Sequence, residues 1–132
     1  TGKKLERLSS HGPQPSIEAL AYSARRMAEA WRGGSVDVLL RRFREYIRVL
    51  QEFDADHDLG IFGAGHAELT AMAAAEGLVY KPCGAGGGDI GILLTDDAAR
   101  ADAFIAESLP GEFRALDLQL DDRGVQVTRE NP

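Results

Sequence analysis

A glycine-rich run between two apolar segments constrains this chain more than any other feature of its sequence. The run is Lys81-Pro-Cys-Gly-Ala-Gly-Gly-Gly-Asp89, with Leu78-Val-Tyr80 before it and Ile90-Gly-Ile-Leu-Leu94 after it. Glycine has no Cβ, so such a loop can adopt positive φ angles and direct several N–H groups to one side. Backbone donors grouped in this way bind anions, most often phosphate. The run therefore predicts a tight loop between two strands and a candidate phosphate contact.

Length and net charge limit the number of domains and the kinds of partner that this chain can have. The chain has 132 residues, with 15 Lys and Arg against 21 Asp and Glu, so its formal net charge is −6. This length suits one domain, and we assign 1–132 to a single domain. The acidic balance argues against nucleic acid as a partner, and no apolar run is long enough to cross a membrane. A single cysteine suits a reducing, cytoplasmic compartment.

Hydrophobic periodicity predicts an α+β fold. Apolar residues recur at helical spacing over 17–31, 36–50, 66–76 and 98–109, with Ser16 and Ser35 as N-caps and Asp54 to Gly65 as a loop. These stripes place Ile17, Trp31 and Met72 in the core. Residues 1–15 carry no periodicity and are predicted to form a loop.

Four segments are predicted to be strands: 78–81, 89–94, 114–120, and a short last strand at Val125 and Val127. Few of them are apolar on both sides. We therefore expect an antiparallel sheet with helices packed on one face.

The glycine loop also carries a resemblance to a known family. Lys81-Pro82 and Gly84-Ala-Gly-Gly-Gly-Asp-Ile-Gly-Ile92 resemble the C-terminal glycine-rich motif of the GHMP small-molecule kinases, which include galactokinase, homoserine kinase, mevalonate kinase and phosphomevalonate kinase. The pattern is most similar to Lys-Pro-Ser-Gly-Ala-Gly-Gly-Gly-Asp of the phosphomevalonate kinase branch, with mevalonate kinases next. Cys83 stands where that branch has Ser. Two further segments resemble the C-terminal half of these kinases: Thr1-Gly2-Lys3 and the tail from Leu116 to Val125.

The resemblance implies both a fold and a reaction. The chain would be the C-terminal domain of a longer kinase, with a ferredoxin-like fold whose first strand lies before Thr1, leaving an open sheet edge. The implied reaction moves the γ-phosphoryl of Mg·ATP to mevalonate 5-phosphate in isoprenoid precursor synthesis. Mevalonate kinase or another sugar or alcohol kinase is the alternative within the family.

Several parts of such a kinase are absent from this sequence. A GHMP kinase holds the nucleotide with a Pro-x-x-x-Gly-Leu-x-Ser-Ser segment and needs an acid for Mg²⁺ and a catalytic Asp or Lys near the acceptor. None of these occurs here, so ATP and Mg²⁺ would be bound mainly by the N-terminal half. Because phosphoryl transfer depends on all these parts, we expect the chain alone to be inactive.

The resemblance implies a set of substrate- and phosphate-binding residues, and it assigns no catalytic residue and no metal ligand within this chain. Asp89 is expected to cap the loop, with a bound hydroxyl or Mg²⁺ as the alternatives, because a carboxylate repels phosphate. Cys83 is expected to be a small buried residue rather than a nucleophile. The binding set is Lys81, Gly84, Ala85, Gly86, Gly87, Gly88, Asp89 and Lys3.

Other polar groups are expected to have simpler roles. Asp54, Asp56 and Asp58 alternate as in an EF-hand, but Leu59 and Gly65 occupy positions that need Gly and Glu, so a solvated acidic turn is expected. The histidines lack metal-ligand spacing, and a surface position is expected for His66.

The remaining polar groups are also expected to be solvated. The arginines from Arg41 to Arg48 form an exposed helix face or meet the other half of an enzyme. Ser9 and Ser10 are expected to lie in a solvated loop.

Two hypotheses of other classes stay open. One is a non-catalytic ferredoxin-like domain whose glycine loop binds a small anion for regulation, and the other is a packing or dimer-forming domain. For the kinase, the expected partners are a phosphorylated alcohol and the N-terminal half of the same enzyme, with a homodimer left open. Nucleic acid and membranes are not expected partners.

Overall fold

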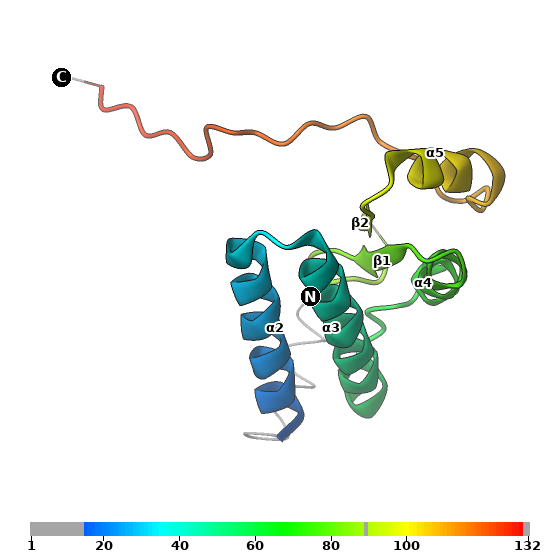
Figure 1. The fold of residues 1–132 in the computed structure, drawn as a ribbon. Coiled ribbons are helices and arrows are strands. Elements are labelled where there is room, and N and C mark those ends of the chain that lie inside the picture. Colours follow the sequence, from blue (N-terminus) through cyan, green and yellow to red (C-terminus); the bar gives the residue numbers. More distant parts are fainter. Residues whose placement is uncertain (1–14, 89, 131–132) are drawn as a thin grey trace.

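A computed structural model describes residues 15–88 and 90–130, and these residues form four helices and two strands (Figure 1). The strands β1 (Val79–Pro82) and β2 (Gly91–Leu94) pair antiparallel, with Val79 opposite Leu94 and Pro82 opposite Gly91. The α+β class is therefore confirmed. The helices are α2 (Pro15–Gly33), α3 (Val36–His57), α4 (His66–Ala75) and α5 (Ala98–Glu107).

The helices α2 and α3 form an antiparallel hairpin (Figure 1). The link between them is short, since α2 ends at Gly33 and α3 begins at Val36. Gly34 turns the chain with a φ of +75°, and the Oγ atom of Ser35 then caps α3 by accepting the Val38 N–H at 3.5 Å. On the face of α3 toward the core, one stripe of side chains is buried: Leu40, Phe43, Ile47, Leu50, Phe53 and His57.

Both helices begin or end outside their predicted limits. α3 continues to His57, because Phe53 and His57 extend its buried stripe at helical spacing, so the loop predicted from Asp54 starts only after the helix. α2 begins at Pro15, a residue that suits the first helical position. Ser16 is therefore inside the helix instead of capping it, and its Oγ lies 3.0 Å from His57 Nε2.

The β1–β2 hairpin separates two clusters of buried side chains. Val79 and Leu94 pack on one side with α3, while Leu78, Tyr80 and Leu93 pack on the other side with α4 and α5. Successive strand residues point to opposite faces, so this alternation means that helices cover both faces. The expectation of helices on one face is wrong, because both faces of these strands are apolar.

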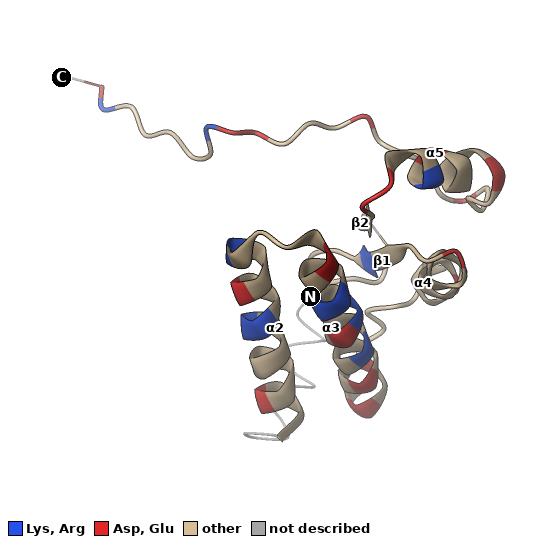
Figure 2. Ribbon diagram, viewed as in Figure 1, with Lys and Arg blue, Asp and Glu red and all other residues tan. Residues whose placement is uncertain are grey.

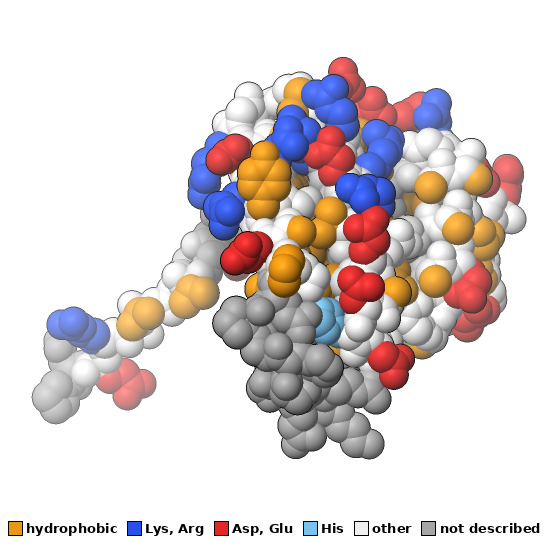
Figure 3. Space-filling model, turned by 90° about the horizontal axis from the view of Figure 1, so that it is seen from below, with side chains coloured by type: hydrophobic (Ala, Val, Ile, Leu, Met, Phe, Trp, Pro, Cys, Tyr) orange, Lys and Arg blue, Asp and Glu red, His pale blue; other side chains and the backbone are white. Residues whose placement is uncertain are grey.

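The predicted strands of the tail do not form. Residues 114–130 run away from the body in extended conformation with no strand pairing (Figure 1), and Leu118, Leu120 and Val125 are 72%, 95% and 95% exposed. Figure 3 shows apolar side chains along this projecting segment. Alternating apolar residues favour a strand only when a neighbouring strand supplies hydrogen bonds, and the described sheet ends at β1 and β2.

Some residues of the predicted helical stripes are exposed. Trp31 is 61% exposed and Ile17 is 41% exposed, because α2 packs against α3 and its other faces meet solvent. Met72 is 37% exposed on α4. Asp97 caps α5, since its side chain accepts the Arg100 N–H at 3.2 Å.

The burial of Phe104 predicts a large loss of stability on truncation. Phe104 is 1% exposed and joins α5 to the cluster of Leu69, Leu78 and Tyr80. We expect Phe104→Ala to lower the free energy of unfolding by about 3–5 kcal/mol, measured by urea denaturation. Ile105→Ala on the neighbouring, 37% exposed position is the control and should cost much less. Equal losses in the two variants would contradict this packing.

Candidate phosphate-binding loop

The glycine run forms the predicted tight loop between two strands. The Cys83 N–H donates to the Ile90 carbonyl at 2.8 Å and closes the base of the loop. Gly84, Gly86 and Gly87 have φ angles of +61°, +69° and +80°, in the region that favours glycine, and Gly88 has +153°. Ala85 is exposed at the tip, and Cys83 is half-buried rather than buried.

A neighbouring turn fixes the shape of the loop from one side. The Gly87 N–H donates to the Ile61 carbonyl at 2.9 Å. A Cβ on Gly86 would lie 2.5 Å from the Ile61 oxygen and 2.8 Å from its Cα, closer than real atoms approach. The clash involves backbone atoms that cannot turn aside. Glycine is therefore required at position 86 by this contact as well as by its φ angle.

The loop offers fewer donors than its sequence predicts. The amides of Gly86 and Gly87 donate to the carbonyls of Cys83, at 3.2 Å, and of Ile61. Within residues 15–88 and 90–130, no hydrogen bond engages the N–H of Gly84 or Gly88. An anion at this loop would therefore meet these two amides first. The binding role of the loop stays a prediction, as does that of Lys3 and Asp89, which lie outside the described residues.

Lys81 contacts the chain itself. Its Nζ donates to the Pro82 carbonyl at 2.7 Å, and the side chain is half-buried. To reach a ligand at the glycine loop, the ammonium must exchange this carbonyl for the ligand's oxygen.

Asp54 holds the turn that supports the loop, and sequence analysis missed this role. From the last turn of α3, Asp54 Oδ1 accepts the Ile61 N–H at 2.9 Å and Oδ2 accepts the Phe62 N–H at 3.0 Å. The expectation of a solvated acidic turn is therefore wrong for Asp54. In contrast, Asp56 and Asp58 are exposed. The available signal was an Asp shortly before a glycine-containing turn, where its side chain can accept backbone N–H groups.

A buried histidine and tyrosine join α4 to the strands. His66 is 2% exposed, so the expected surface position is wrong, and its Nδ1 lies 2.8 Å from the Tyr80 hydroxyl. That hydroxyl occupies the space beside Gly91 where a Cβ would clash. Within the described part of the chain, His66 Nε2 has no hydrogen-bond partner. The pair therefore ties the start of α4 to the hairpin that carries the glycine loop.

Burial sets the protonation of this pair. Loss of solvent lowers the pKa of His66, because the protein interior disfavours the imidazolium. Burial also raises the pKa of the Tyr80 phenol, and Coulombic repulsion from Cys83 adds to this increase. Both groups are therefore held in their neutral forms near pH 7. In their neutral forms, His66 and Tyr80 can form one ordinary hydrogen bond, in which one group donates and the other accepts.

Two further findings concern the described residues only. None of their His, Cys, Asp and Glu side chains form a group of three that could hold a metal ion. Among the same residues, no helix combines the length and apolar character that a membrane span needs. The polar groups that the loop and its flanking strand offer to a ligand are backbone amides and the Lys81 ammonium.

Comparison with known proteins gives one curated relative. The chain is 36% identical over 89 residues to a protein named phosphomevalonate kinase from Streptomyces sp. (strain CL190). The match covers 67% of this chain but 24% of the relative, so the chain spans about a quarter of that protein's length. No family model matches the chain, and no solved structure matches it. The similarity supports a relation to GHMP-type kinases.

Removal of the Asp54 carboxylate is expected to loosen the glycine loop. Asp54→Ala leaves the Ile61 and Phe62 amides without their acceptors, at a cost of about 1–3 kcal/mol for each buried donor. We expect lower stability in urea denaturation together with faster hydrogen exchange of the Gly87 amide. Asp56→Ala, two residues away on the same helix and exposed, is the control. Unchanged exchange at Gly87 would show that Asp54 does not support the loop.

The lowered pKa of His66 predicts a loss of stability in acid. The unfolded chain binds a proton on this imidazole near its ordinary pKa of about 6.5, whereas the folded chain resists protonation, so unfolding is favoured as the pH falls below that value. In urea denaturation from pH 7.5 to 5, His66→Gln should show a weaker pH dependence than the unmodified chain. An unchanged slope between these variants would contradict the assignment to His66.

Proposed function

We propose that this chain is the C-terminal, acceptor-side part of a GHMP kinase that transfers the γ-phosphoryl of Mg·ATP to mevalonate 5-phosphate. The observation that carries the proposal is the 36% identity over 89 residues to a phosphomevalonate kinase. The glycine run adds to it, since its residues from Cys83 to Gly88 lead from β1 into a constrained loop. A mevalonate kinase or another alcohol kinase of the family is the alternative.

In this proposal the loop contacts the phosphorylated acceptor. The N–H groups of Gly84 and Gly88 face no acceptor among the described residues, and they would donate to phosphate oxygens. Lys81 would turn from the Pro82 carbonyl and neutralise part of the ligand's charge. ATP and Mg²⁺ would be bound by other parts of the enzyme, so the chain alone would not turn over.

The rigidity of the loop supports a role in phosphoryl transfer. Such transfer depends mainly on positioning and on charge stabilisation, and misplacement by about 1 Å can cost about 100-fold in rate. The contacts of Asp54 with the Ile61 turn, and of that turn with Gly86 and Gly87, hold the loop before any ligand arrives. A preorganised loop loses little further freedom when it binds.

A non-catalytic anion-binding domain is the second candidate, and one observation favours it. Gly86 and Gly87 use their amides within the protein, and Lys81 is bonded to its own strand, so the loop as it stands offers a weak site. A weak site suits a regulatory anion at high concentration better than a tightly held acceptor. The two candidates differ in whether the loop contributes to turnover.

A chimeric enzyme tests the proposal. The matching segment of the Streptomyces sp. phosphomevalonate kinase is replaced by this chain, and ADP release is measured with mevalonate 5-phosphate and, separately, with mevalonate. We expect turnover with mevalonate 5-phosphate. Gly86→Ala in the chimera should lower kcat/KM by about 100-fold, because the clash with Ile61 displaces the loop.

Gly111→Ala is the matched control, since a Cβ at Gly111 meets no atom within 4 Å. Its kcat/KM should stay near that of the unmodified chimera. A folded chimera that binds pyrophosphate but does not turn over either acceptor would favour the non-catalytic domain. Equal effects of the two substitutions would remove the glycine loop from the reaction.

A further inference from the structure

A surface hollow away from the glycine loop gathers arginine side chains from two helices. The hollow has a volume of about 490 Å³ and lies between α3, the turn from α4 to β1, and the start of α5. Leu40 contributes its buried floor. The polar residues around it are Asp37, Arg41, Arg44, Gly77, Asp96 and Arg100.

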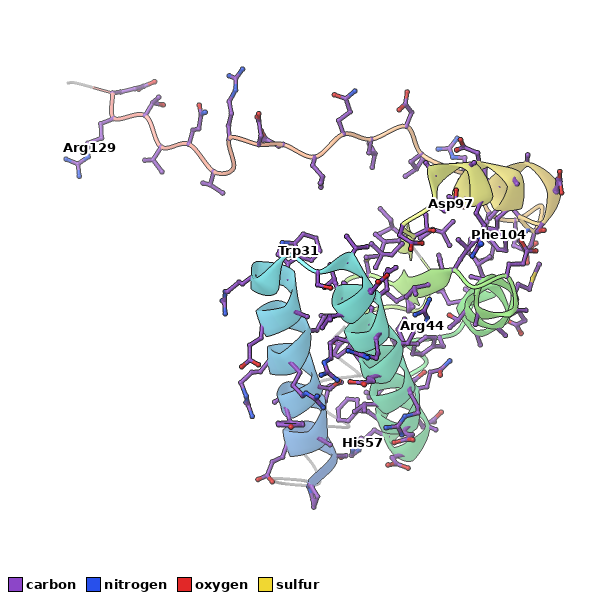
Figure 4. The ribbon with its side chains drawn as sticks, in the orientation of Figure 1. Trp31, Arg44, His57, Asp97, Phe104 and Arg129 are labelled. Atoms are coloured by element: carbon purple, nitrogen blue, oxygen red, sulfur yellow. The ribbon has the colours of Figure 1, made fainter. Side chains whose placement is uncertain are left out.

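Two of the guanidinium groups meet at one residue. Arg44 Nη2 donates to the Gly77 carbonyl at 3.2 Å, and Figure 4 shows Arg44 reaching from α3 toward β1 and α4. Arg100 Nη1 lies 3.1 Å from the position that a Cβ on Gly77 would occupy. Gly77 has a φ of +76° and no side chain, so it leaves room for the Arg100 guanidinium. Arg44 and Arg100 are therefore brought together at the rim of the hollow.

The arginines of α3 fall into two groups by their partners. Arg42 and Arg48 form ion pairs with Glu45 at 2.8 Å and Glu52 at 2.6 Å. Arg41 and Arg44, which line the hollow, have no carboxylate within 4.0 Å among the residues that the structure describes. Arg41 and Arg44 thus face the hollow without a direct carboxylate contact among the described residues, whereas Arg100 Nε lies 4.0 Å from Asp97 Oδ2.

The lining of the hollow combines three arginines with the carboxylates of Asp37 and Asp96, in a chain whose net charge is −6. The hollow lies beside the first turns of α3 and α5, where aligned peptide dipoles place partial positive charge. Figure 2 shows the basic segments of α3 and the basic segment at the start of α5. Arginine also presents a planar set of donors that matches the oxygens of phosphate.

We propose that this hollow binds a small phosphate monoester of a polyol. Arg41, Arg44 and Arg100 bind the phosphate group, and Asp37 and Asp96 accept hydrogen bonds from the hydroxyl groups of the same ligand. The two carboxylates repel a ligand that carries only anionic groups, so the mixed lining selects a molecule with both features. This site shares no residue with the glycine loop, and the inference does not depend on the proposed kinase function.

The test uses the full 132-residue chain with ¹⁵N labels and three probes: glycerol 3-phosphate, pyrophosphate and succinate. Glycerol 3-phosphate should give saturable shifts of the Gly77 amide and of the Arg44 and Arg100 side-chain signals, with weaker binding of the other two. The double variant Arg41→Gln/Arg44→Gln should weaken it by about tenfold or more, because charge-assisted hydrogen bonds are lost. Arg48→Gln on the same helix should change the affinity less than about twofold.

A second double variant keeps the test decisive if the arginine variant fails to fold. Asp37→Asn/Asp96→Asn should strengthen pyrophosphate binding and remove the preference for glycerol 3-phosphate. The proposal is overturned if no probe shifts Gly77, if succinate binds as well as the phosphates, or if Arg48→Gln weakens binding as much as the double variant. Shifts confined to Gly84 and Gly88 would overturn it too, while leaving the proposed function intact.

Discussion

The shape of the glycine loop depends on the hydrogen bonds of the Asp54 carboxylate. This carboxylate accepts two adjacent amides, Ile61 and Phe62, and so fixes the turn that follows α3. The same turn presents the Ile61 carbonyl to Gly87 and leaves no room for a side chain at Gly86. A long helix, a turn and a glycine loop are thereby joined through one side chain. Without the Asp54 carboxylate, β1 and β2 would still pair. The turn at Ile61 would then no longer be held in place to set the shape of the loop between the strands.

The hairpin itself is stabilised from both sides. Val79 faces the cluster built on α3, and Tyr80 faces the cluster built on α4 and α5. The second cluster includes a polar contact, since His66 and Tyr80 share a hydrogen bond inside it. This hydrogen bond satisfies His66 Nδ1 and the Tyr80 hydroxyl, and so it favours one orientation of α4 relative to the strands. The glycine loop is thus held by a packed frame as well as by Asp54.

Similar sequence patterns led to different structures at several positions. Alternation predicted strands at both 89–94 and 114–120, yet only the first found a partner, in β1. Asp54 and Asp56 looked alike in sequence, but only Asp54 faces the turn. Among the arginines of α3, spacing showed one polar face, whereas the structure separates Arg42, which pairs with Glu45, from Arg41 and Arg44, which have no carboxylate within 4.0 Å among the described residues. Each of these differences depends on which groups meet in the folded chain, and the periodicity of the pattern does not record this.

The sequence by itself determined the local elements of this protein. Helical periodicity, capping residues and glycine positions located the four helices, the hairpin and the tight loop, because these features depend on neighbours within a few residues. Only the tertiary structure decided that helices cover both faces of the hairpin, that His66 is buried, and that Asp54 supports the loop. It also decided which loop amides are engaged within the protein. The reason is that burial and hydrogen-bond partners are set by segments that meet in space, and a one-dimensional pattern does not record which segments these are.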